Sequence, residues 1–312
     1  MKAIYLSVVI PVYNEAGNLP NLYNRLITTL DSIGKPFEII FTNDGSQDES
    51  LTILEKFHQE RPEQIRIIDF NGNFGQHKAV MAAFANVRGE VIVTLDADLQ
   101  NPPEEIIKLL EKIEIGHDYV GGIRRMRHDS FFRRYGSKLN NFLRLKITGI
   151  KMEDQGCMLR AYKRNIIDLM VSSNESSTFI PALAYQFSAN PIEIEVGHSA
   201  RESGDSKYNL YRLLRLSFDL MTGFSLLPLQ IFTVSGIIVS LLSALFVIYM
   251  FLRRIMIGPE AEGLFTLFAI LYLLIGLLLM GLGILGEYIG RIYLEVRKRP
   301  NYVIRNIIEK ID

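Results

Sequence analysis

VIVTLDADLQ, residues 91–100, shows the organisation of the chain most clearly, because an apolar run passes directly into a pair of carboxylates. The run 91–95 consists almost entirely of Val, Ile and Leu, which favours a strand buried on both faces, as in a parallel sheet. Ligands of open α/β sheets bind beyond the carboxyl ends of the strands, where Asp96 and Asp98 would lie. We therefore expect a buried strand at 91–95 with a polar site at its end.

The same pattern extends toward the N-terminus and a short way beyond residue 100. Further strands are expected at Leu6–Ile10, Phe37–Thr42 and Ile65–Asp69. Amphipathic stretches lie between and after the strands, near residues 18–33, 48–60, 75–87 and 103–115. This alternation over residues 1–120 predicts an α/β fold in which helices cover both faces of a parallel sheet.

Asp96 and Asp98 are spaced so that both carboxylates can flank one divalent cation. Mg²⁺ and Mn²⁺ prefer oxygen ligands and often share them with substrate phosphates, and Gln100 adds a neutral oxygen nearby. Such pairs also cap helices, but residues 101–104 (NPPE) are able to start the next helix without them. The sequence thus predicts a Mg²⁺ or Mn²⁺ site at Asp96, Asp98 and Gln100.

Two other strand ends also carry polar side chains. Pro11, Tyr13 and Glu15 follow the first strand, and the ring and the carboxylate suit a nucleobase and its N–H groups. An N-cap before the helix expected at 18–33 explains them as well. Residues 43–48 (NDGSQD) follow the second strand and suit a turn with capping side chains equally well. Each of these segments alone leaves its role open.

The composition excludes several classes of protein. The 312 residues include 34 Lys and Arg against 34 Asp and Glu, which gives no reason to expect a nucleic-acid partner. A single cysteine excludes an intramolecular disulfide framework and a Cys-rich zinc site. No Gly-x-Gly-x-x-Gly follows the first strand, which disfavours a dinucleotide oxidoreductase. The apolar run at the N-terminus is too short for a signal peptide, so we expect the catalytic part to be cytoplasmic.

The chain becomes strongly apolar after residue 219. Neither Leu220–Leu252 nor Gly263–Gly286 contains a charged residue, and roughly 20 apolar residues suffice to span a bilayer. We expect a multi-pass protein of the plasma (inner) membrane with helices at 226–252 and 263–287, rather than two buried core helices. The residues that follow are basic and favour a cytoplasmic location for both ends of this hairpin: Arg291, Arg297, Lys298 and Arg299. Arg253 and Arg254 in the hairpin loop argue weakly for the opposite orientation.

Residues 124–147 form a basic region in which aromatic and aliphatic side chains are interleaved. Its cations are Arg124, Arg125, Arg127, Arg133, Arg134, Lys138, Arg144 and Lys146, against the single acid Asp129. A basic amphipathic helix of this kind typically lies at a membrane surface, and Tyr208–Leu220 is a second one. The final segment, 301–312, fits either a short strand or a helix.

In their order along the chain, the segments around Tyr13, Asp44 and Asp96 resemble those of the family 2 glycosyltransferases. Within that family the chain is most similar to the polyprenyl-phosphate glycosyltransferases, which include dolichyl-phosphate mannose synthases and bactoprenol glucosyltransferases. The resemblance covers nearly the whole chain and implies a GT-A (Rossmann-like) catalytic domain over residues 1–200. The other implied segments are a donor-phosphate loop with an interfacial helix (201–225), two membrane helices (within 226–290) and a cytoplasmic tail (291–312).

The resemblance also implies roles in binding the nucleotide-sugar donor. The residues that would contact the base and the ribose are Pro11, Tyr13, Glu15 and Asp44. The family often has Asp-Asp where this chain has Asn43-Asp44. Asp96 would support both the nucleotide and the metal, which Asp98 and Gln100 would ligate. The residues expected to hold the donor diphosphate are Arg201, Ser206 and Lys207, because a leaving diphosphate needs fixed positive charge. Lys78, in NFGQHK at 73–78, follows a Gly turn at a helix start that also suits phosphate.

On the acceptor side, Arg124, Arg127 and Arg133 are candidates to hold a lipid phosphate in line with the sugar. Asp154 would face the acceptor as a catalytic residue and Arg160 would pair with it, although a salt bridge that holds this loop explains the pattern equally well. The second pKa of a phosphate monoester is about 6, so the acceptor is already an anionic nucleophile at neutral pH. A strong general base is therefore not required.

We expect inverting transfer of a hexose, in the first place glucose from UDP-glucose, to polyprenyl (undecaprenyl) phosphate for cell-envelope glycosylation. GDP-mannose, UDP-N-acetylglucosamine and an aminoarabinose donor are alternatives, as is a non-catalytic membrane protein that binds nucleotide sugars. A processive synthase is disfavoured, because the chain has no Trp and hence no Gln-x-x-Arg-Trp motif. Gly286 and Gly290 give the second membrane helix a small-residue face, which predicts close helix packing and a homo-oligomer.

Overall fold

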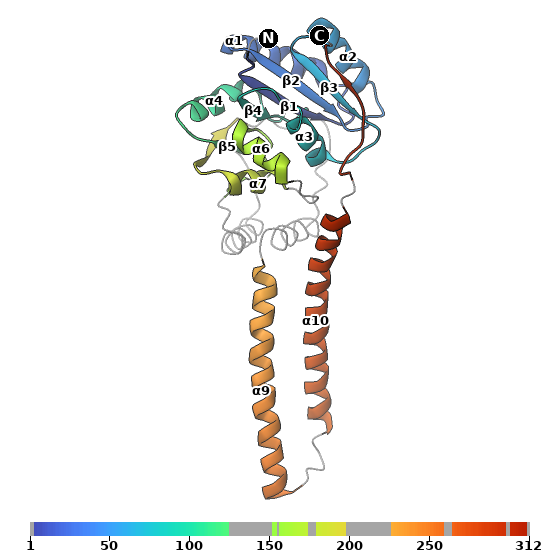
Figure 1. Ribbon diagram of the computed structural model, residues 1–312, viewed down its shortest axis with the longest axis vertical. Coiled ribbons are helices and arrows are strands. Elements are labelled where there is room, and N and C mark those ends of the chain that lie inside the picture. The colour runs from blue at the N-terminus through green and yellow to red at the C-terminus, as the bar shows by residue number, and fades with distance from the viewer. Residues whose placement is uncertain are drawn as a thin grey trace. The chain divides into compact units, whose positions relative to one another are not determined.

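The expected alternation of strands and helices forms the first of two units in the computed structural model (Figure 1). This sheet unit consists of Met1–Asn141, Ile150–Lys207 and Arg299–Asp312, and the second, helical unit consists of Phe142–Gly149 and Tyr208–Lys298. The residues that the structure describes are 3–124, 152–154, 156–173, 179–197, 226–258, 264–297 and 300–310. The expected interfacial segments, 125–147 and 201–225, lie outside these ranges.

Among the described residues, eight strands form one mixed sheet in the order β7-β5-β6-β4-β1-β2-β3-β8. The strands are β1 (Leu6–Val12), β2 (Phe37–Asn43), β3 (Ile65–Phe70), β4 (Val91–Thr94), β5 (Tyr119–Arg124), β6 (Arg160–Lys163), β7 (Pro191–Val196) and β8 (Ile304–Ile308). The first four are parallel to one another, as expected from their largely apolar sequences. They therefore end together at one side of the sheet, which we call the carboxyl edge, and begin at the amino edge.

The parallel sheet expected over residues 1–120 is confirmed for β1 to β4, whereas β6 and β8, which lie outside that range, make the whole sheet mixed. β6 is antiparallel to both β4 and β5. The chain leaves β5 at the carboxyl edge, and Asp154, which precedes β6, bonds Arg124 at the end of β5, so β6 has to run back toward the amino edge. β8 is antiparallel to β3 and pairs Phe70 with Ile304 and Ile67 with Ile308. The segment that fitted a strand or a helix is thus an edge strand of the sheet unit.

The helices of the sheet unit up to residue 114 lie close to the expected positions, and α6 and α7 were not predicted. They are α1 (Leu19–Ile33), α2 (Ser50–Glu60), α3 (Gln76–Phe84), η1 (Pro103–Glu105), α4 (Ile106–Glu114), α6 (Arg164–Ser173) and α7 (Ile180–Phe187). α3 packs against β1, β2 and α6, whereas α1 packs against α2 and η1, so helices form two groups around the sheet (Figure 1). The stretch expected to be a helix at 103–115 begins as the 3-10 turn η1, with a proline at its first position, where no N–H donor is needed.

Apolar periodicity accounts for how the helices are held. α1 buries Leu19, Leu22, Leu26 and Leu30, which recur every three or four residues and so form one stripe along the helix. The helix ends at Gly34, whose φ of +69° allows its N–H to bond a carbonyl of the last turn. These side chains pack with the strands in one continuous core. Folding of this part rests on local patterning that the sequence displays directly.

The helical unit contains two long helices, α9 (Leu227–Ile257) and α10 (Leu264–Arg297). Within the described residues, one segment is long and apolar enough to cross a membrane by length and composition, the 24 residues Ile270–Tyr293 of α10. The apolar segment of α9, Leu229–Leu242, is shorter. The expected two-helix membrane hairpin is therefore not confirmed, and the first span stays a prediction.

Close packing between α9 and α10 occurs at a glycine. A Cβ atom added to Gly281 would lie 2.0 Å from Cζ of Phe232, so a larger residue has no room there. Gly286 and Gly290 have no neighbouring atom within 4 Å of such a Cβ. The small-residue packing expected for this helix thus occurs at Gly281 within the chain, and the expected homo-oligomer stays a prediction.

Candidate active site

The loops that follow β1 and β2 are joined by hydrogen bonds. Asn14 has a φ of +55° and its N–H donates to Oγ of Ser46 (3.1 Å), while its Oδ1 accepts the N–H of Gln47 (2.8 Å). The N–H of Glu15 donates to Oγ of Ser50 (2.9 Å). Tyr13 remains 45% exposed beside this junction. The two loops form one surface, on which the ring of Tyr13 is accessible for stacking.

Gly45 fixes the β2 loop against the next loop of the carboxyl edge. Its φ is +69°, and an added Cβ would lie 2.5 Å from the carbonyl carbon of Gly72. Backbone therefore packs directly on backbone, which only glycine permits. Asn43, at the position where the family often has Asp, donates from Nδ2 to Oδ1 of Asp69 (2.7 Å) and accepts the N–H of Ser46 (3.2 Å). An amide fits this place because it donates and accepts at once.

Asp44 binds the backbone of the loop between β3 and α3. Its two carboxylate oxygens accept the N–H groups of Phe74 (2.7 Å) and Gly75 (2.8 Å), and the residue is only 3% exposed. Burial raises the pKa of Asp44 above its usual value, although these N–H groups and the charge of Lys78 oppose the rise. The expected contact of Asp44 with base or ribose stays a prediction. The structure adds a role that the sequence did not indicate, which is to hold residues 74–75.

Asp96 and Asp98 lie where the sequence predicts them, directly beyond the end of β4. Nε2 of Gln76 donates to Oδ1 of Asp96 (2.6 Å), and the N–H of Gln100 donates to Oδ1 of Asp98 (3.1 Å). Leu99, between Asp98 and Gln100, has a φ of +59°, a strained backbone conformation for a side chain of this size. Burial, followed by the negative charges of Asp98 and Glu15, raises the pKa of Asp96 to about 7, against the effects of Arg124 and Gln76.

The donor set of this site fits a hard divalent cation. Asp96 and Asp98 supply carboxylate oxygens, and crowded negative charge is relieved by a bound cation. No group of three or more His, Cys, Asp or Glu side chains is arranged to hold a metal among the residues that the structure describes. Further ligands would therefore have to come from Gln100, water or substrate phosphate, as is usual for Mg²⁺. The metal site stays a prediction with a compatible geometry.

Asp154 pairs with Arg124, which ends β5. Nε of Arg124 lies 2.6 Å from Oδ2 of Asp154 and Nη2 lies 2.8 Å from Oδ1, a bidentate ion pair. Burial would raise the pKa of Asp154, but the hydrogen bonds and charge of Arg124 outweigh it and hold the pKa below its usual value. A Cβ added to Gly156 would lie 2.7 Å from Nη2 of Arg124, so a larger residue there would displace this guanidinium.

The expected pairing of Arg160 with the Asp154 carboxylate is not what the structure shows. Arg160 is fully buried, and its Nη2 donates to the backbone oxygen of Asp154 (2.6 Å) while Nε donates to that of Cys157 (2.7 Å). Nη1 contacts the hydroxyl of Tyr119. Because Arg160 lies in β6 beneath the loop, it reaches the loop's carbonyls, and the more exposed Arg124 takes the carboxylate. The structure shows an ion pair of Asp154 in this loop, but with Arg124 instead of Arg160, and the catalytic role expected for Asp154 stays a prediction.

The model of the family "Glycosyl transferase family 2" matches residues 7–170, slightly more than half of the chain. The chain belongs to this family. A protein of Edwardsiella ictaluri (strain 93-146) named undecaprenyl-phosphate 4-deoxy-4-formamido-L-arabinose transferase is 48% identical over 306 residues, which are 97% of this chain and 94% of that protein. A protein of the same name from Klebsiella pneumoniae (strain 342) is 47% identical over 307 residues, or 98% and 94% of the two chains.

Among solved structures, glucosyl-3-phosphoglycerate synthase from Mycobacterium tuberculosis is similar to this family 2 glycosyltransferase, with 17% identity and a TM-score of 0.46. The similarity covers 70% of this chain and 78% of that one. A likeness of this size supports no conclusion about ligands. The resemblance of the sequence to family 2 is confirmed by the family model and the relatives instead.

The structure brings together most of the site residues that the sequence of this family 2 glycosyltransferase indicates at the carboxyl edge. The residues near the ends of β1, β2, β4 and β5 are Pro11, Tyr13, Glu15, Asp44, Asp96, Asp98, Gln100 and Arg124. Lys78 lies in the first turn of α3. The predicted site residues outside the described ranges are Arg127, Arg133, Arg201, Ser206 and Lys207. Gln76, which binds Asp96, was not predicted, although it lies in the Gly-turn segment at 73–78.

Proposed function

We propose that the chain transfers 4-deoxy-4-formamido-L-arabinose from a nucleotide donor to undecaprenyl phosphate. The observation that carries this proposal is the match to relatives of that name, at 47–48% identity over 97–98% of the chain. It favours the aminoarabinose alternative and gives no support to glucose from UDP-glucose, our first expectation. The similarity extends over 97% of the chain and therefore includes α10, which contains the candidate membrane span.

The geometry of the carboxyl edge supports a donor site. Tyr13 presents an exposed ring for the base, and Glu15 lies close enough for its charge to raise the pKa of Asp96. Asp96, Asp98 and Gln100 would hold Mg²⁺ or Mn²⁺, and such an ion neutralises charge on a departing diphosphate. Arg201, Ser206 and Lys207 are proposed to bind the same diphosphate, and Lys78 a neighbouring phosphate. Fixed groups of this kind lower the barrier because they need not reorganise during the reaction.

The acceptor is proposed to react in a single in-line step. A lipid phosphate oxygen attacks the anomeric carbon, the bond to the donor diphosphate breaks, and the configuration inverts. Arg124, Arg127 and Arg133 are proposed to orient the acceptor phosphate. The Asp154 ion pair orients the guanidinium of Arg124 and places it where its charge lowers the pKa of Asp96. A residue with a pKa raised for proton abstraction is not required, since the nucleophile is already an anion with a second pKa of about 6.

The proposal includes a location at the plasma (inner) membrane, with the sheet unit on the cytoplasmic side. The apolar side chains of the candidate span are mostly exposed, among them Leu278, Leu282 and Ile289. Exposed apolar surface of this extent is typical of a helix that contacts lipid. A second span in α9 would make the chain multi-pass, with a tail that returns to the sheet as β8.

The test is transfer of labelled sugar into an organic-extractable lipid by the purified full-length protein. Undecaprenyl phosphate and Mg²⁺ or Mn²⁺ would be supplied together with one donor at a time. The donors are the uridine diphosphate derivatives of 4-deoxy-4-formamido-L-arabinose, glucose and N-acetylglucosamine, and GDP-mannose. We expect labelling from the formamido-arabinose donor, lost in Asp98→Asn and retained in Asp168→Asn, a matched change on the exposed face of α6. Labelling from another donor would overturn the choice of sugar. Absence of labelling from every donor, with folded protein, would favour the nucleotide-sugar-binding alternative.

A further inference from the structure

The C-terminal strand contacts the loop that binds two carboxylates of the candidate site. The ring of Tyr302 stacks on Phe70 with 5.1 Å between centroids and 10° between planes, and Phe70 meets the edge of Phe74 at 5.6 Å. The N–H of Asn71 also donates to the carbonyl of Val303 (3.1 Å). Residues 302–303, just before β8, thus pack along the segment 70–74 at the carboxyl edge.

That loop connects the end of β3 to both sides of the site. Phe74 and Gly75 donate their N–H groups to Asp44, and Gln76, the next residue, donates to Asp96. A displacement of Phe74 therefore changes the partners of both carboxylates. Aromatic pairs contribute beyond their buried area and prefer definite relative orientations, so the ring contacts restrict where Phe74 can lie.

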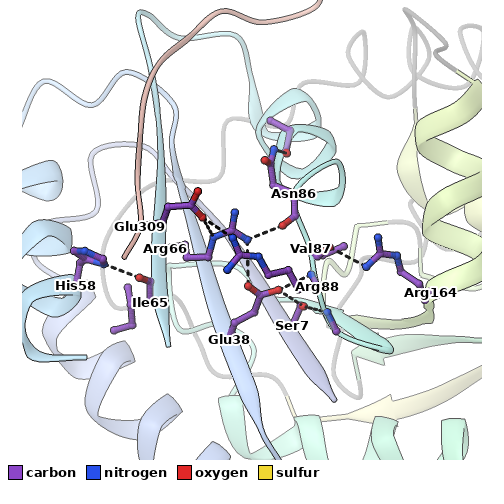
Figure 2. Close-up of polar contacts among 12 residues, drawn as sticks. Ser7, Glu38, His58, Ile65, Arg66, Asn86, Val87, Arg88, Arg164 and Glu309 are labelled. Atoms are coloured by element: carbon purple, nitrogen blue, oxygen red, sulfur yellow. Dashed lines mark hydrogen bonds and ion pairs between the residues drawn. The ribbon is translucent and has the colours of Figure 1, made fainter. Parts of the chain in front are cut away.

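The other end of the strand is anchored independently at the amino edge. Oε2 of Glu309 accepts hydrogen bonds from Arg66 and Arg88, both at 2.8 Å (Figure 2). Arg66 continues to Glu38, which is 1% exposed and bonds Ser7 as well. The pair of Arg66 with Glu38 is buried and costly to break, whereas Glu309 is partly exposed and joins it from the strand end. The anchor holds β8 in register, far along the strand from the contacts of Tyr302.

We propose that Tyr302 is a positioning residue of the donor site, which acts through Phe70 and Phe74 on the loop 71–76. This inference rests on the proposed function, because it takes the carboxyl edge as the place where the nucleotide sugar binds. Only residues 298–299 separate the end of α10 from the segment 300–303. The candidate membrane helix is therefore followed almost directly in the sequence by Tyr302, which packs beside the loop 71–76. The ring contact of Tyr302 is with Phe70, so its effect on the carboxylates of the site would be indirect.

Three variants separate positioning from simple stability. Tyr302→Ala removes the ring, Tyr302→Phe keeps the stack without the hydroxyl, and Glu309→Gln weakens the anchor at the far end of the same strand. For Tyr302→Ala we expect a rise in donor KM of about tenfold, equivalent to about 1.4 kcal/mol, with little change in acceptor KM. Tyr302→Phe should have the same donor KM as the wild type. Glu309→Gln should lower the melting temperature and leave the donor KM unchanged.

Amide hydrogen exchange of the full-length, nucleotide-free protein tests the inference without any transfer reaction. The N–H groups of Phe74 and Gly75 should exchange faster in Tyr302→Ala than in the wild type, and at the wild-type rate in Tyr302→Phe. Unchanged exchange in Tyr302→Ala, or equal acceleration in Glu309→Gln, would overturn the inference whatever the substrate proves to be. If exchange is faster in Tyr302→Ala but the wild-type protein transfers none of the sugars, the role of Tyr302 in holding this loop is supported. Only the proposed function is then contradicted.

Discussion

Two carboxylates at opposite edges of the same sheet, Glu38 and Asp96, have opposite electrostatic surroundings. At the amino edge, Glu38 accepts hydrogen bonds from Ser7 and the N–H of Arg88 and forms an ion pair with Arg66 (Figure 2). At the carboxyl edge, Asp96 accepts a bond from the neutral Gln76 and faces the second carboxylate of Asp98. A buried carboxylate that is paired with a cation holds the strands around it together. Like charges placed close together are instead typical of a site that binds a ligand. Carboxylates alone therefore do not mark function; the groups around them do.

The largest expected effect comes from removing the compensation at the amino edge. Arg66→Met leaves Glu38 buried without its cation, which should lower the free energy of unfolding by about 3–5 kcal/mol. Arg61→Met is the matched control, because its partner Asp31 is solvated and such pairs contribute up to about 1 kcal/mol. Denaturant unfolding followed by circular dichroism measures both. Equal decreases in the free energy of unfolding in the two variants would show that the buried pair contributes no more to stability than the solvated one.

The opposite result is expected at the carboxyl edge. Asp96→Asn keeps the shape and the bond to Gln76 but removes a charge that faces Asp98. We expect transfer to fall by at least about 100-fold, the scale of a lost electrostatic contact to the reacting charge. The free energy of unfolding at pH 8 should stay equal or rise, since a repulsion is relieved. A variant that is both inactive and destabilised would mean that Asp96, like Glu38, is a structural carboxylate.

The carboxyl edge also depends on glycine for the contact between its loops. Gly45→Ala combines a φ of +69° with a Cβ placed 2.5 Å from Gly72, and should cost about 1–3 kcal/mol and raise the donor KM. Gly34→Ala has the same φ but nothing within 4 Å, so it should cost only the local backbone strain. Thermal unfolding and donor KM, measured for both, separate the clash from the strain. Identical behaviour of the two variants would remove the β2 loop from the donor site.

The sequence predicts the elements well where structure follows from local pattern. The runs that became β1 to β4 are rich in Val, Ile, Leu and Phe, and the polar residues after them lie at one edge because parallel strands end together. The pairing of Arg124 with Asp154 joins residues 30 positions apart, and no local signal distinguishes it from a pairing with Arg160. The strand character of β8 depends on β3, 234 or more residues earlier, which supplies its hydrogen bonds. Contacts between distant segments set these features, so periodicity could not predict them.

The pH dependence of stability offers the smallest and most specific test of how the carboxyl edge compensates charge. Arg124 lowers the pKa of Asp154, so this pair stabilises the fold above the unfolded-state pKa of Asp154 and loses that contribution as the pH falls through the lower folded-state value. In Asp154→Asn the contribution is absent at every pH. The difference in melting temperature between wild type and variant should therefore be largest near neutral pH and shrink below about pH 4, the usual pKa of Asp. A difference that stays constant down to pH 2 would mean that the ion pair contributes nothing through its charge, and that Asp154 holds Arg124 and Gly156 by hydrogen bonding alone.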